Sequence, residues 1–205
     1  MVAQVRRPAD AAHSRRLFTV VEYHRMIAAG ILGERDRVKL VGGEVVEMSA
    51  MGARHARSVA FLDDELRAPL AGRAQTRSQL PVTIPEYNEP EPDIAVVRSR
   101  EDGYVANHPG PDDVPLLIEV SDSTLEYDGG VKAPVYAGAG IPEVWIVSLR
   151  GGEVERRSDP HRAAGAYRSV VRFRRGETVS SEVLLGSAFA VDALLGPAPE
   201  ATASP

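Results

Sequence analysis

The chain has 205 residues, 26% of them charged, which is enough for one domain with a substantial core and gives no sign of general disorder. It has no cysteine, which excludes disulfides, thiolate nucleophiles and cysteine-ligated zinc, and is consistent with a reducing compartment. Its formal net charge is −5, whereas dedicated nucleic-acid-binding proteins are usually basic. No stretch reaches membrane-spanning length and the first residues lack a signal-peptide core, so we expect a cytoplasmic protein with no membrane association.

Composition divides the chain into three parts. Residues 1–17 are polar and are expected to be flexible, and residues 196–205, rich in proline and alanine, are expected to be a disordered tail. The folded domain is therefore expected over residues 18–195.

The N-terminal part of this domain shows helix and hairpin patterns. Thr19 and Glu22 form a capping-box pattern at the start of a helix, and Gly30 is a stop signal. Gly42-Gly43 between two short strand patterns indicates a hairpin, and Pro69 is expected to end a second helix. The predicted elements are a helix over Val20–Ala29, strands over Arg37–Val41 and Glu44–Met48, and a helix over Ala53–Leu66.

The remaining part of the domain shows several strand patterns and one further helix pattern. A loop rich in glycine, proline and aspartate is expected over 98–114, and the strand–helix–strand pattern over 116–147 predicts a parallel crossover. The predicted elements are strands Ala74–Leu80, Pro81–Ile84, Asp93–Val97 and Leu116–Val120, a helix Val131–Ala139, and strands Val144–Val147, Val154–Arg157 and Tyr167–Phe173. We therefore predict an α/β fold with a mixed central sheet flanked by helices.

One carboxylate stands inside the most apolar strand pattern. The run Pro115–Val120 is typical of a central strand covered on both faces, and it contains Glu119. A buried ionised carboxylate costs several kcal/mol unless it is compensated. Glu119 therefore needs an arginine or lysine, a metal ion or a raised pKa, unless it lies at a frayed strand end that reaches water.

A second acid precedes another apolar strand. Asp93 follows Pro92 and opens the run Ile94–Val97. If this strand neighbours that of Glu119, the two carboxylates converge at one end of the sheet. Two carboxylates, a backbone carbonyl and waters are a usual ligand set for Mg²⁺. The alternative is an aspartate that only caps a turn.

A lysine is the third candidate. Position i+2 from Glu119 shares its strand face, but that residue is Ser121. The chain has only two lysines, Lys39 and Lys132, and Lys132 begins the next predicted helix. A helix folded back over the sheet would bring its ammonium to Glu119; otherwise Lys132 is a solvated residue in a first helical turn.

At this point the chain resembles the Uma family of endonucleases, which belong to the PD-(D/E)-x-K restriction-endonuclease-like superfamily. The combination of motifs in order, from about Phe18 to Phe173, carries this resemblance. The matching segments are Phe18-Thr19, Glu22-Tyr23, Gly30–Leu32, Gly43–Val46, Met48-Ser49, His55, Glu91–Val97, Leu117–Thr124, Asp128, Lys132, Tyr136-Ala137, Gly140-Ile141 and Glu143–Val147.

The resemblance implies a Mg²⁺-dependent phosphodiesterase acting on DNA, with Mn²⁺ as an alternative ion. Asp93 and Glu119 would be metal ligands, helped by the Val120 carbonyl, and a metal-activated water would be the nucleophile. Lys132 would be the superfamily's catalytic lysine, moved from strand to helix. Asp128 would pair with this lysine or cap the helix, and capping is the commoner role. Because duplex cleavage needs two sites, a homodimer is an expected assembly.

The chain departs from its relatives at several positions. Lys39 stands before the hairpin where a glutamate is common, Val144 replaces a usual tyrosine, and Ser148 a frequent aspartate. Pro134 falls inside the predicted helix, where it is tolerated only in the first turn. The three core residues are unchanged.

Other polar residues have a functional and an ordinary reading. His55 is a candidate for acid–base work or phosphate contact, or else a capping or surface residue. Glu44 is a candidate further acid of the metal site, and Gln79 either supports the site or faces solvent from its strand. Trp145 lies in a fully apolar strand and is expected in the core.

A catalytically inactive binding or assembly module is the alternative to an enzyme, because a fold does not guarantee a function. In that case Asp93 and Glu119 would be compensated by Lys132 or an arginine without metal. The acidic net charge and the low lysine content favour this alternative.

Overall fold

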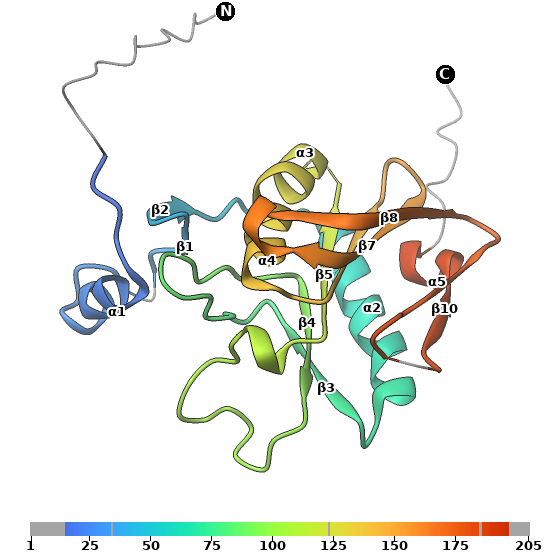
Figure 1. Ribbon diagram of the computed structural model, residues 1–205, viewed down its shortest axis with the longest axis horizontal. Coiled ribbons are helices and arrows are strands. Elements are labelled where there is room, and N and C mark those ends of the chain that lie inside the picture. Colours follow the sequence, from blue (N-terminus) through green and yellow to red (C-terminus); the bar gives the residue numbers. More distant parts are fainter. Residues whose placement is uncertain (1–14, 34, 123, 185, 197–205) are drawn as a thin grey trace, which may run out of the picture.

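A six-stranded sheet forms the centre of the computed structural model, which describes residues 15–33, 35–122, 124–184 and 186–196 (Figure 1). The strands lie in the order β3-β4-β5-β6-β7-β8, and all neighbours are antiparallel except β5 and β6, which are parallel. They are β3 (Ala74–Ser78), β4 (Ile94–Arg98), β5 (Leu116–Ser121), β6 (Glu143–Ser148), β7 (Glu153–His161) and β8 (Ala166–Arg174). The predicted α/β class with a mixed central sheet is confirmed.

Two small antiparallel sheets and several helices surround this sheet (Figure 1). The small sheets are β1 (Val38–Val41) with β2 (Glu44–Glu47), and β9 (Thr178–Ser180) with β10 (Ala188–Ala190). The helical segments are α1 (Val20–Ala28), α2 (Ala53–Leu70), η1 (Pro111–Asp113), α3 (Leu125–Tyr127), η2 (Asp128–Lys132), α4 (Ala133–Ala139), η3 (Arg162–Ala164) and α5 (Val191–Leu195).

The central strands are covered on both faces. Along β5, Leu116, Ile118 and Val120 pack in a core shared with α2 and α5, whereas Leu117 packs in a second core shared with α4. This alternation follows from the two-residue period of a strand. Every residue of β5 and β6 is buried, so a polar side chain on β5 needs a partner within the protein.

The crossover between β5 and β6 is helical, as predicted, but it begins at Leu125 rather than near Val131. Its middle part, η2, is a π-helix, in which the Ala133 N–H donates to the Asp128 carbonyl five residues before it. Pro134 then occupies the first turn of α4, where a missing N–H is tolerated. The proline is therefore compatible with one continuous helical segment.

The hairpin β1–β2 and the capping box of α1 are confirmed. Gly42 and Gly43 have φ angles of 58° and 76°, which a type I′ two-residue turn requires. The Thr19 side chain accepts from the Glu22 N–H, and the Glu22 carboxylate accepts from the Thr19 N–H.

Some element predictions were wrong. Helix α2 continues past Leu66 through Pro69, because Leu70 in its last turn is also buried in the core. The predicted strand Pro81–Ile84 forms only an isolated bridge, so its apolar pattern reflects burial of an irregular segment. Elements β9, β10 and α5 were not predicted.

The predicted terminal segments 1–17 and 196–205 lie almost entirely outside the described residues. In the part of the chain that the structure describes, no helix combines the length and the apolar character needed to cross a membrane.

Candidate active site

A cleft of about 840 Å³ lies where the β1–β2 hairpin faces the start of β4 and the end of β5. The hairpin and the segment after it, the first turn of α2, and the η2 segment supply most of its walls. The lining residues are Arg37, Lys39, Val46, Glu47, Met48, Ser49, Ala50, Met51, Gly52, His55, Gln79, Glu91, Asp93, Val120, Asp122, Thr124, Tyr127, Asp128 and Lys132.

Strand register brings the two predicted acids together. The β4–β5 ladder pairs Ile94 with Ile118, so continuing it by one residue puts Asp93 opposite Glu119. Directly opposed residues project from the same face of an antiparallel pair. Asp93 also forms a hydrogen bond to β5, since its Oδ2 accepts from the Val120 N–H at 2.7 Å.

Glu119 is wholly buried and has two side-chain donors. Its Oε2 accepts from Lys132 Nζ at 2.7 Å and its Oε1 accepts from the Tyr136 hydroxyl at 2.6 Å. Burial raises the pKa of Glu119 to about 7, although the Lys132 ammonium opposes this rise. The frayed-end alternative is therefore wrong: Glu119 has a lysine partner and a raised pKa.

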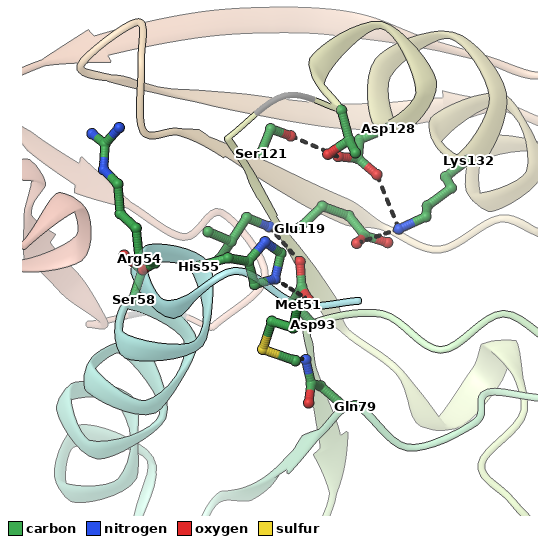
Figure 2. A network of polar contacts seen from close by, with 12 residues as sticks. Met51, Arg54, His55, Ser58, Gln79, Asp93, Glu119, Ser121, Asp128 and Lys132 are labelled. Carbon is green, nitrogen blue, oxygen red and sulfur yellow. Dashed lines mark hydrogen bonds and ion pairs between the residues drawn. The ribbon is translucent and has the colours of Figure 1, made fainter. Parts of the chain in front are cut away.

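Lys132 lies between two carboxylates (Figure 2). Its Nζ is 2.9 Å from Asp128 Oδ1, and Asp128 Oδ2 accepts from the hydroxyls of Ser121 and Thr124 at 2.7 and 2.6 Å. Burial lowers the pKa of Lys132, but the negative charges of Glu119 and Asp128 raise it by more, so the net change in its pKa is upward. The structure thus gives Asp128 the pairing role and not the commoner capping role, because it points into the protein.

His55 joins this cluster from the first turn of α2. Its Nε2 lies 2.8 Å from Asp93 Oδ1, and this hydrogen bond raises the pKa of His55 (Figure 2). The side chain is half-buried and lines the cleft, so of the two readings the structure favours a role in the site over a surface position.

Comparison of the sequence with known protein families agrees with the geometry of the site. The model of the Uma2 family, described as "Putative restriction endonuclease", matches residues 20–193. The chain belongs to the Uma2 family. The resemblance inferred from the motifs is confirmed. Membership of this family supports the interpretation of the protein as a nuclease that acts on nucleic acid.

A solved structure shares the fold of this Uma2 chain. A crystal structure of a protein from Anabaena variabilis ATCC 29413, described as "a putative nuclease belonging to DUF820", superimposes with a TM-score of 0.68 at 14% identity. The match covers 87% of this chain and 97% of that one. No curated protein matches the chain.

The remaining candidates of the Uma2 chain divide into three outcomes. Gln79 lines the cleft, and its amide lies 3.6 Å from Met51 Sδ. Glu44 is exposed on the hairpin and pairs with Arg15 at 2.6 Å, so the structure does not bring it to the acids. Trp145 is fully buried in the core, as predicted.

Sequence reasoning missed three side chains of this Uma2 site. Tyr136 lies one helical turn after Lys132, and this i,i+4 spacing was the signal that both contact the same carboxylate. Lys39 and Tyr127 also line the cleft, with the Lys39 ammonium 5.7 Å from the centre of the Tyr127 ring. Their proximity depends on how the hairpin packs, which no local pattern reveals.

The donor set of the Uma2 site fits a hard divalent cation. Among the described residues, no three His, Cys, Asp or Glu side chains are close enough to form a metal site by themselves. Two carboxylates on neighbouring strands, with backbone oxygen and water, are nevertheless the partial protein ligand set that Mg²⁺ accepts. The cleft is also lined by five carboxylates against three lysines and arginines, an excess of negative charge that a cation would balance.

Proposed function

We propose that this protein is a metal-dependent endonuclease that hydrolyses phosphodiester bonds of DNA. The observation that carries the proposal is the cluster in which Asp93 and Glu119 face one way from neighbouring strands, with the Lys132 ammonium 2.7 Å from Glu119. Restriction-endonuclease-like enzymes generally use divalent metal ions, which agrees with the donor set.

Asp93 and Glu119, with the Val120 carbonyl, would hold Mg²⁺ or Mn²⁺. When bound, such an ion supplies an activated water as nucleophile and neutralises charge on the phosphate. An acidic cleft would otherwise repel the phosphodiester, so the cation is also needed for binding.

Lys132 acts as a fixed positive charge in this proposal. Its two carboxylate partners raise its pKa, which keeps the ammonium protonated and suits it to stabilise developing charge on phosphate and not to act as a base. Asp128 and Glu119 hold it in place at 2.9 and 2.7 Å. His55 positions the Asp93 carboxylate through its 2.8 Å hydrogen bond.

The test is cleavage of supercoiled plasmid and of single-stranded DNA with Mg²⁺ or Mn²⁺. Glu119→Gln and Asp93→Asn should each lower the rate at least about 100-fold, since even outer-shell changes at metal sites cost 10- to 100-fold. Asp159→Asn is the matched control, because Asp159 is exposed on a surface ion pair and its φ of 57° is one that asparagine tolerates. Unchanged activity in both site variants would overturn the proposal.

The same assay addresses the proposed homodimer. A single site nicks one strand, whereas two sites acting together convert supercoiled plasmid directly to linear DNA. We expect linear product without accumulation of nicked circles, and a rate that depends on protein concentration near the dimer dissociation constant.

A binding module without chemistry is the second candidate, and one observation favours it. All four carboxylate oxygens of Asp93 and Glu119 have protein partners without metal: His55, the Val120 N–H, Tyr136 and Lys132. Calorimetric titration with Mg²⁺ and Mn²⁺ separates the two candidates. Binding heat that Asp93→Asn abolishes supports the nuclease, and its absence from the wild type supports the module.

A further inference from the structure

The two lysines of the chain are both in the cleft. Of the 24 lysines and arginines, only Lys39 and Lys132 are lysines, and both line this one cavity. They come from distant elements, β1 and η2, and they flank the same aromatic ring: the ammonium groups lie 5.7 and 5.9 Å from the centre of Tyr127.

The two ammonium groups differ in their partners. Lys132 has two carboxylates at 2.7 and 2.9 Å. Lys39 is half-buried, and among the described residues its side chain has no hydrogen bond and no ion pair, only the contact with Tyr127. A half-buried charge without a counter-ion is costly, so such a charge facing a cavity is a candidate for ligand binding.

The surroundings of Lys39 identify the kind of ligand. Burial lowers the pKa of Lys39 and the Lys132 ammonium lowers it further, so an anion bound beside Lys39 would oppose both effects. Acidic groups that face Lys39 are Glu119, Asp128 and Asp93, which raise its pKa without contacting it. Glu91 also faces Lys39, because the Lys39 ammonium opposes the rise in the Glu91 pKa that burial causes. Arg37, which directly precedes β1, is exposed and adds a cation to the lining of the cleft.

We infer that Lys39, held against the Tyr127 ring, forms an anion-binding subsite that takes a backbone phosphate of the nucleic acid, separate from the phosphate position served by Lys132. A nucleic-acid strand carries one phosphate per nucleotide, so one strand can present different phosphates to the two lysines. Lys39 is then a substrate-binding residue. The inference rests on the proposed function for the identity of the substrate.

The test is equilibrium binding of a fluorescent single-stranded oligonucleotide, with Ca²⁺ in place of Mg²⁺ to suppress cleavage. Lys39→Met should weaken binding about 5- to 10-fold for any base sequence, as loss of one phosphate contact does, and should lower the salt slope by about 0.7. Lys39→Arg, which keeps the charge, should retain most of the affinity. Arg168→Met, in an exposed ion pair, is the control and should change nothing.

Kinetics provide a second measurement. Lys39→Met should raise KM with little change in kcat, because the lost contact is made in both ground and transition states. Oligonucleotide binding and a salt slope that are equal in wild type and Lys39→Met, with intact cleavage, would overturn the subsite and leave the nuclease standing. If binding depends on Lys39 but the wild type cleaves no DNA, the subsite stands and the nuclease proposal is overturned. A wild type that binds no oligonucleotide overturns the subsite.

Discussion

The Glu119–Lys132 pair shows what a buried ion pair does to protonation. The two side chains are 1% and 9% exposed, so each compensates a charge that water cannot reach. The pKa of Glu119 rises from 4.5 to about 7, which means that the folded state binds a proton more tightly than the unfolded state. The stability that this proton contributes is complete below pH 4.5 and is lost as the pH rises through 7.

Removal of the lysine partner should make this dependence steeper. In Lys132→Met the carboxylate loses the ammonium that opposes its upward shift, so its pKa should rise above 7. At pH 8 the buried carboxyl group must then either stay ionised without its partner or take up a proton that the unfolded state does not bind, and we expect a loss of about 3–5 kcal/mol in the free energy of unfolding. At pH 5 the loss should be smaller. Urea denaturation in EDTA at both pH values measures this difference.

Two controls make the experiment specific. Lys39→Met removes the other lysine of the cleft, which has no ion pair among the described residues, and should cost little stability. Lys132→Met combined with Glu119→Gln should recover part of the loss at pH 8, since no ionised carboxylate remains at position 119. A loss in Lys132→Met that is the same at pH 5 and pH 8 would contradict the assignment.

At the scale of elements, the β1–β2 hairpin carries Lys39 to the cleft and depends on its turn for attachment. The Gly43 N–H donates to the Tyr87 carbonyl at 2.7 Å, and the Gly43 carbonyl accepts from the Phe18 N–H at 2.8 Å. A side chain at this position would lie 2.7 Å from the Leu17 Cβ. The turn glycine is therefore needed both for its φ angle and for close packing.

The two turn glycines should differ when each is replaced by alanine. Gly42→Ala and Gly43→Ala both force a left-handed φ on alanine, which costs about 1–2 kcal/mol. Only Gly43→Ala adds a clash, because the position of a Gly42 Cβ is open, so it should cost about 1–3 kcal/mol more. Thermal denaturation of the two variants gives this difference, and equal losses would contradict the predicted clash with Leu17.

At the scale of the whole molecule, an acidic chain presents an acidic cleft. The net charge is −5, and the cleft is lined by Glu47, Glu91, Asp93, Asp122 and Asp128 against Arg37, Lys39 and Lys132. Mutual repulsion of these carboxylates opposes folding, so a bound divalent cation should stabilise the native state as well as admit a polyanion.

Metal binding should therefore raise the melting temperature. At a free Mg²⁺ concentration 100 times the dissociation constant, the native state gains about 2.7 kcal/mol. For a chain of this size, this corresponds to an increase in Tm of roughly 5–10 °C. Asp93→Asn should abolish the increase, while Asp159→Asn, which makes the same charge change in an exposed ion pair, should keep it. The comparison needs a matching NaCl series, because ionic strength alone also screens the cleft.

The sequence determined those features that local pattern controls. The apolar run around Glu119 predicted a buried central strand, and the paired glycines predicted the hairpin, because strand period and turn φ angles depend on adjacent residues. The motifs also identified the family, whose model covers residues 20–193. By contrast, residues 178–195 gave no clear pattern, and their short strands and helix form only against the rest of the core.

Only the tertiary structure decided how the candidate residues combine. His55 and Asp93 are 38 residues apart in the chain, and packing of α2 on the sheet brings them within 2.8 Å. The hairpin places Lys39 in the cleft and leaves Glu44, five residues later, exposed to solvent. Local propensity sets which residues form strands and helices, but contacts between distant segments depend on the whole core. For this reason the sequence indicated the acids and the lysine, and the fold supplied their partners.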